Sequence, residues 1–252
     1  MIIMINNKNE REQKKNEAIS MREAGDLENA LNLFEEIEKW DEKNGNPTGQ
    51  IDVLGHIRIT YDRLGDQADK LEEKKKMYEK EREALEKALD IVEDSDVGRK
   101  AILQVHLASS KFSLAVLKED LEKKNDLLDA LEIINKAIEN LPGTIAHKAW
   151  PLNIQAKILF ELDREEEGFE AVTLGEKCIF QGYNDQIEAS DNAELEIKVW
   201  LSGLYLTLAK YFSSKKENIL AELYAGVVSK MPDPNNLLGE RKKEAERILE
   251  KL

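Results

Sequence analysis

Hydrophobic residues recur every three or four positions along almost the whole chain, and no stretch alternates as a β-strand would. The clearest stripe lies in residues 27–42 and consists of Leu27, Ala30, Leu31, Phe34 and Ile37. Such a stripe is typical of a helix that buries one face. The same spacing predicts about eleven helices. Their expected ranges are 10–23, 27–42, 50–64, 67–93, 97–118, 126–140, 144–162, 165–181, 189–212, 216–230 and 236–251.

Turn-forming residues separate the expected helices. Gly25 and Gly65 are each followed by Asp, a pattern that predicts the end of one helix and the cap of the next. The composition of residues 44–49 and 181–185 predicts loops. Pro151 falls inside a helical pattern, which predicts either a helix that begins there or a kink. Because most turns are short, neighbouring helices are expected to pack as antiparallel hairpins.

Two of the expected helices differ from the others in composition. Residues 67–93 begin with a run of Lys, Glu and Arg, which is typical of a solvated helix stabilised by charge pairs one turn apart. Residues 189–212 form the most apolar helix, so we expect it to be buried on several sides. Its part 195–212 is also a candidate surface for self-association.

Residues 11–41 contain a helix pair with a characteristic order of small and large residues. The signature residues are Ala18, Met21, Gly25, Asp26, Ala30, Phe34 and Ile37. This pattern resembles the tetratricopeptide repeat, a helix–turn–helix unit in which small residues let two helices approach closely. Further matches are Tyr61 and Gly65, then Ala130, Ile134, Ala137 and Pro142, then Ala156, Leu159, Asp163, Gly168, Val172 and Gly175, and finally Trp200, Gly203, Ala221 and Ala225.

The resemblance implies an all-α fold, namely a right-handed α-solenoid of antiparallel helix hairpins. About five irregular units would cover residues 10–231. Residues 1–9 are expected to be a flexible N-terminus, and residues 232–252 a C-terminal helix that caps the array. The 14-3-3 proteins share this length, acidity and helix pairing, but their phosphate-binding set of Lys, Arg, Arg and Tyr is not found in this sequence.

Composition and charge argue against several classes of function. The chain has 252 residues, a net charge of −14 and 41% hydrophobic residues, which is too apolar for a disordered chain. A nucleic-acid binder, or a protein held on an anionic membrane, needs a basic face. The first residues lack the basic segment and apolar core of a signal peptide, and the longest uncharged run, 199–209, is too short to span a membrane. With Cys178 as the one cysteine, we expect a cytoplasmic protein.

No group of residues in the sequence has the spacing of a catalytic or metal site. His56, His106 and His147 lack a Glu, His or Cys one turn away on the same helix face. No glycine-rich loop could hold a phosphate, and no nucleophile elbow is present. Cys178 is interpreted as a small core residue. The sequence therefore predicts no enzyme, no metal and no cofactor.

In an array of this kind the first helix of each hairpin lines the concave face. The candidate peptide-binding residues are Lys15, Arg22, Asp62, Trp150, Asn153, Lys157 and Phe160, and the further inward-facing positions are Ile19, Asp52 and Ile59. The alternative for each is an ordinary solvated position or, for Trp150 and Phe160, the core. The family's peptide-carboxylate site pairs a Lys with an Asn one turn later. Because Ile19 follows Lys15 here, the resemblance does not predict capture of a terminal carboxylate.

These observations favour non-catalytic protein or peptide binding, as an adaptor or scaffold that uses its concave face. The net charge of −14 favours a basic or neutral segment as the partner, without nucleic acid or membrane. The alternative is a peptide-responsive regulatory protein of the helical-repeat type. An enzyme is the least expected class.

Overall fold

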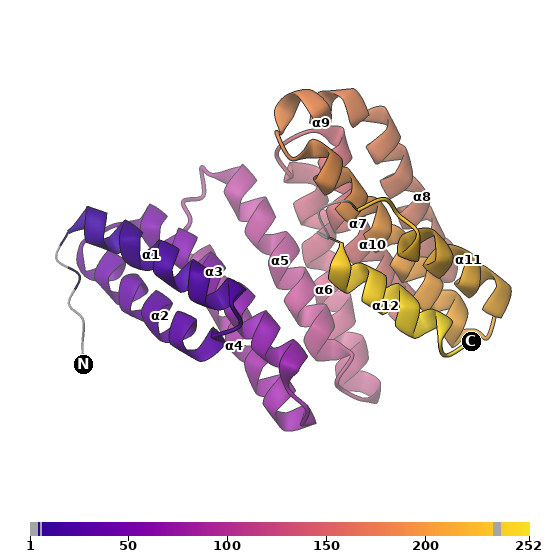
Figure 1. The fold of residues 1–252 in the computed structure, drawn as a ribbon, viewed down its shortest axis with the longest axis horizontal. Coiled ribbons are helices and arrows are strands. Elements are labelled where there is room, and N and C mark those ends of the chain that lie inside the picture. The colour runs from indigo at the N-terminus through magenta and orange to yellow at the C-terminus, as the bar shows by residue number, and fades with distance from the viewer. Residues whose placement is uncertain (1–4, 6, 234–237) are drawn as a thin grey trace. The chain divides into compact units, whose positions relative to one another are not determined.

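The computed structural model describes residues 5, 7–233 and 238–252. In this part of the chain the secondary structure consists of twelve α-helices and one short 3-10 helix, without any strand. The all-α class predicted from the hydrophobic spacing is confirmed. The helices divide into two compact units, residues 1–133 and 134–252, and the boundary falls inside α6 (Asp120–Asn140) (Figure 1).

In the N-terminal unit, each of the helices from α1 to α5 packs against the next one along the chain. These helices are α1 (Lys8–Glu23), α2 (Leu27–Lys43), α3 (Pro47–Gln67), α4 (Leu71–Ile91) and α5 (Val97–Ala115). Their shared core contains fully buried Phe34, Ile37 and Val53. Ala18 and Ala30 are also completely buried, and their small side chains let α1 and α2 approach closely. The helix pair predicted for residues 11–41 is therefore present as α1 and α2.

Of the two glycines predicted to end helices, only Gly25 does so. Its φ is +89°, and the N–H of Asp26 donates to the carbonyl oxygen of Met21 at 2.9 Å, which closes the end of α1. Gly65 lies inside α3, where a Cβ atom would come within 2.6 Å of the Tyr78 ring. Gly65 therefore makes room for an aromatic ring from α4. The single helix predicted for 67–93 was wrong at its start, because α3 runs through Gln67 and α4 begins at Leu71.

The C-terminal unit contains the remaining helices. They are the 3-10 helix η1 (Ile145–Lys148), α7 (Ala149–Glu161), α8 (Glu165–Gln181), α9 (Tyr183–Ala189), α10 (Ala193–Ser214), α11 (Asn218–Ser229) and α12 (Gly239–Leu249). The loop predicted for 181–185 was wrong, because α9 begins at Tyr183. Seven residues are too few to show a helical stripe in a sequence. Pro151 lies in the first turn of α7, as the first of its two predicted alternatives required.

Helix α10 is the central element of the C-terminal unit. It contacts α7, α8, α9, α11 and α12, and Leu204 and Ala209 are completely buried. Its large apolar side chains are buried or partly buried, and self-association through residues 195–212 stays a prediction. An exposed apolar stripe lies on α11 instead, at Ile219, Leu223 and Val227.

The sequence predicts a flexible N-terminus and a C-terminal capping helix. Residues 1–4 and 6, within the expected flexible stretch 1–9, lie outside the described residues, whereas Lys8 opens α1. Residues 234–237 also lie outside them, and α12 follows over Gly239–Leu249, where it packs against α10 and α11.

Candidate ligand-binding groove

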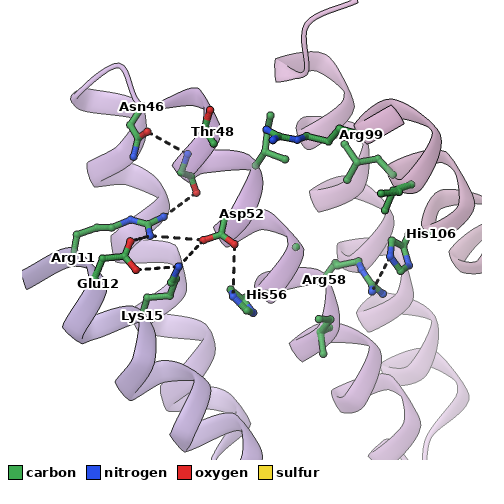
Figure 2. Close-up of a pocket in the computed structure, with 16 residues that line it drawn as sticks. Arg11, Glu12, Lys15, Asn46, Thr48, Asp52, His56, Arg58, Arg99 and His106 are labelled. Carbon is green, nitrogen blue, oxygen red and sulfur yellow. Dashed lines mark hydrogen bonds and ion pairs between the residues drawn. The ribbon is translucent and has the colours of Figure 1, made fainter. Parts of the chain in front are cut away.

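A groove with a volume of about 770 Å³ lies in the N-terminal unit and is lined by α1, α3 and α5 (Figure 2). Every second helix thus contributes to it, which is the arrangement expected for a row of helix hairpins. The apolar part of its lining consists of Ile51, Ile59, Ile102 and Leu103. The charged and imidazole side chains are Arg11, Glu12, Lys15, Asp52, His56, Arg58, Arg99 and His106.

Charge pairs join α1 and α3 along one wall of the groove (Figure 2). The Lys15 ammonium lies 2.9 Å from Asp52 Oδ2 and 3.1 Å from Glu12 Oε2. Partial burial opposes the charged form of Lys15, but the hydrogen bonds to Asp52 and Glu12 prevail and raise its pKa. Asp52 also lies 4.0 Å from His56 Nε2. Lys15 therefore stays charged and is held in place by two carboxylates.

A buried ion pair anchors this wall from behind. Arg11 is only 4% exposed and Asp41 is completely buried, with 2.7 Å between Arg11 Nη2 and Asp41 Oδ2. Arg11 also donates to the carbonyl oxygen of Gly49 at 3.0 Å, so one side chain links α1, α2 and the start of α3. Asn46 donates to the other Asp41 oxygen at 2.6 Å. A pair buried this deeply needs such additional hydrogen bonds to offset its loss of hydration.

Arg58 occupies the opposite wall, between α3 and α5 (Figure 2). Its Nη1 lies 3.5 Å from Glu81 Oε1, and its Nη2 lies 3.5 Å from His106 Nε2. Both contacts are at the long limit for hydrogen bonds. Burial and the Arg58 charge lower the pKa of His106 to about 3, so its imidazole is neutral. Burial and the Asp62 charge raise the pKa of Glu81 to about 7. Arg58 is thus a charged donor with only weak partners.

The predicted site residues of the N-terminal unit are only partly brought together. Lys15 lines the groove, as do the inward-facing positions Asp52 and Ile59. Arg22 does not line it, because its guanidinium contacts Glu23 and His56 and lies 5.9 Å from the centre of the Phe34 ring. Asp62 is half-buried outside the lining, and burial together with the Asp66 charge raises its pKa. Ile19 packs against the core.

The other predicted residues, on α7 of the C-terminal unit, have separate environments. Trp150 stacks on His147, with 5.6 Å between the ring centres. Phe160 packs against Phe169 and Tyr211, with ring centres 5.2 and 4.3 Å away, so it is part of an aromatic cluster. Asn153 is buried, and its Oδ1 accepts a hydrogen bond from Thr207. Lys157 is half-buried.

Several groove residues were missed by sequence reasoning. Arg11 lies one helical turn before Lys15 on the same face of the helix. The expectation that the first helix of each hairpin lines the concave face could therefore have indicated Arg11 as well. Arg99, Ile102 and His106 are on α5, whose inner face follows the same hairpin order and could have indicated them. Arg58 carries no such signal, because its role depends on the distance between α3 and α5.

The groove lining combines guanidinium, ammonium, carboxylate and imidazole groups. Its lining contains no Cys or Ser, and its two imidazoles adjoin arginines, which oppose protonation. Among the described residues, no cluster of three or more His, Cys, Asp or Glu could hold a metal ion. Cys178 is buried in α8, and burial raises the pKa of its thiol. None of the described helices is both long and apolar enough to cross a membrane.

No protein-family model matches the chain, and no curated protein matches it at a significant level.

Proposed function

We propose that the protein is a non-catalytic scaffold that binds a protein or peptide segment in the groove between α1, α3 and α5. The helix hairpins would form a right-handed α-solenoid of the tetratricopeptide type, with this groove on its concave face. The observation that carries the proposal is the groove of about 770 Å³, which combines an apolar floor with charged walls. Ligand sites in proteins have this size and this mixture of surfaces.

The lining indicates what kind of segment would fit. Ile59, Ile102 and Leu103 offer contacts for an apolar side chain. Arg58 would donate to a carbonyl or carboxylate oxygen of the segment, since its contacts to Glu81 and His106 are both 3.5 Å long. The lining has four cationic and two anionic side chains, so its local charge is positive, whereas the net charge of the chain is −14. An extended segment with an acidic or neutral residue beside an apolar one is therefore the proposed ligand.

The test is a selection of peptides from a random library on the full chain, followed by titration of an enriched peptide. Ile59→Glu places a charge on the apolar floor, so we expect the affinity to fall at least about tenfold. Leu121→Glu is the matched control, because Leu121 is 70% exposed on α6 and outside the groove lining. The affinity of the Leu121→Glu variant for the enriched peptide should stay within about twofold of the wild-type affinity.

Circular dichroism and thermal unfolding would verify that both variants fold. If the folded Ile59→Glu variant binds the enriched peptide as tightly as the wild type, the groove is not its binding site. If no peptide is enriched above background, peptide binding itself is contradicted.

A further inference from the structure

Helices α7, α10 and α12 bring a second group of polar side chains together, in the C-terminal unit. Asn153 and Lys157 lie one turn apart on α7. Gly203 lies on α10, one turn before Thr207. Arg241 is on α12. This group is separate from the groove, none of whose lining residues belongs to these helices.

Two nitrogen donors converge over Gly203. A Cβ atom at this position would lie 2.8 Å from Arg241 Nη1 and 3.0 Å from Asn153 Nδ2. Both nitrogens therefore pack over the backbone of α10 and lie near each other, so one small oxyanion beside them could contact both. The absence of a side chain on Gly203 is what lets the two donors approach α10 this closely.

The Asn153 amide is oriented with its donor side towards this point. Thr207 Oγ1 donates to Asn153 Oδ1 at 2.7 Å, which occupies the acceptor side of the amide. Asn153 is 9% exposed, and no described residue accepts a hydrogen bond from its Nδ2. The side chain is thus largely buried, while its Nδ2 donor is available to a ligand.

The positive charges at this position lack partners. Lys157 and Arg241 are both half-buried, and neither forms an ion pair or hydrogen bond with any described residue. The nearby carboxylate is Glu244 on α12, which is already paired with Lys210 on α10. Burial, with the charges of Lys210 and Arg241, lowers the pKa of Lys157 to about 8. Half-buried cations are normally paired, so this local excess of positive charge favours an anion.

We propose that Asn153, Lys157 and Arg241 form a binding site for an oxyanion, the carboxylate or phosphate group of a ligand. The guanidinium would hold two of its oxygens, the amide one of them, and the ammonium would supply further charge. The site does not depend on the groove in the N-terminal unit, and either could exist without the other.

Inorganic phosphate and acetate serve as probes of the full chain at constant ionic strength, with chloride as the reference anion. We expect saturable shifts of the Asn153 side-chain NH₂ signals in ¹H–¹⁵N NMR spectra with phosphate, and weaker ones with acetate. A stronger response to acetate would assign the site to carboxylates instead. Raising the pH from 7 through 9 should weaken the phosphate response, because Lys157, whose charged neighbours are Lys210, Arg241 and Glu244, loses its own charge in this range.

Lys157→Met and Arg241→Gln should each weaken phosphate binding at least about tenfold. Lys230→Met is the matched control, since Lys230 is an exposed cation on the same unit, and it should bind as the wild type does. Gly203→Ala provides a second route, because its methyl group would come too close to both donors and displace them while the helix remains intact. Equal phosphate affinity in the wild type and in these three site variants, or shifts that do not saturate, would overturn the proposal.

Discussion

The two units use positive charge in opposite ways. In the N-terminal unit every cation that lines the groove has a carboxylate partner, from the Arg11–Asp41 pair to Arg99, whose Nε is 3.3 Å from Asp96. In the C-terminal unit Lys157 and Arg241 have none among the described residues. A paired charge contributes polarity and shape to a site, whereas an unpaired one attracts a counter-charge.

This difference separates structural cations from candidate binding cations. Removing a paired, buried cation leaves a carboxylate without its partner and destabilises the fold. Removing an unpaired, half-buried cation relieves a desolvation penalty and a repulsion. The same type of substitution should therefore change stability in opposite directions in the two units.

The largest expected effect follows the loss of Arg11. Arg11→Met leaves the completely buried Asp41 with the Asn46 amide as a donor, and we expect the free energy of unfolding to fall by about 3 kcal/mol. Urea denaturation followed by circular dichroism would measure it. The double variant Arg11→Met/Asp41→Leu should recover most of the loss, because no charge is then left buried.

Lys80→Met is the control for this effect. Lys80 forms an exposed pair with Glu83 at 2.6 Å, and pairs of that kind contribute little to stability. If Arg11→Met were no more destabilising than Lys80→Met, the buried pair would not be what holds α1, α2 and α3 together.

The opposite sign is expected for Lys157→Met. The pKa of Lys157 is about 8 in the folded protein instead of its ordinary value of 10.5, so the unfolded chain binds more protons between these two values. Below pH 8 the charged Lys157 therefore lowers the free energy of unfolding of the wild type by its full amount. This loss of stability disappears as the pH rises towards 10.5. After allowance for its partial exposure, we expect the variant to be about 1–2 kcal/mol more stable at pH 7, with the difference shrinking above pH 8.

Denaturation of both proteins at a series of pH values would measure this difference. A variant that is less stable than the wild type at pH 7, or a difference that does not change with pH, would mean that Lys157 is not an unpaired buried cation. The comparison between the two units would then lose its basis.

Much of the fold was predictable because helix formation and burial leave a local periodic signal. The stripe in residues 27–42 corresponds to α2, and Gly25 ends α1 with the positive φ that its residue type allows. The predicted helix boundaries were wrong where the local sequence signal is weak or is compatible with two structures. Gly65 could end a helix or accept an aromatic ring, and only the position of Tyr78 distinguishes the two.

The candidate sites were less predictable, because they depend on which side chains meet across helices. Lys15 was found from the order of helices, whereas Arg58 became visible only with its distances to Glu81 and His106. Asn153 and Lys157 were found as concave positions, but their relation to Arg241 needs the packing of α12. The net charge also concealed that both candidate sites have a local excess of cationic side chains.

The smallest expected effect concerns the two titrating partners of Arg58. His106 has a pKa of about 3 instead of 6.5, so the unfolded chain binds more protons in this window and stability falls as the pH decreases. Glu81 has a pKa of about 7 instead of 4.5, so the folded chain binds more protons in that window and stability rises as the pH decreases. Between pH 6.5 and 4.5 the two contributions oppose each other, because burial disfavours the charged form of both the acid and the base.

His106→Gln removes one of these contributions and leaves the other. Relative to the wild type, the variant should gain about 1 kcal/mol of stability as the pH falls from 6.5 to 4.5, measured by urea denaturation. Glu81→Gln should change the slope in the opposite direction, which makes the two variants controls for each other. Parallel pH profiles for all three proteins would contradict both shifted pKa values and the burial of Glu81 and His106 that chiefly causes them.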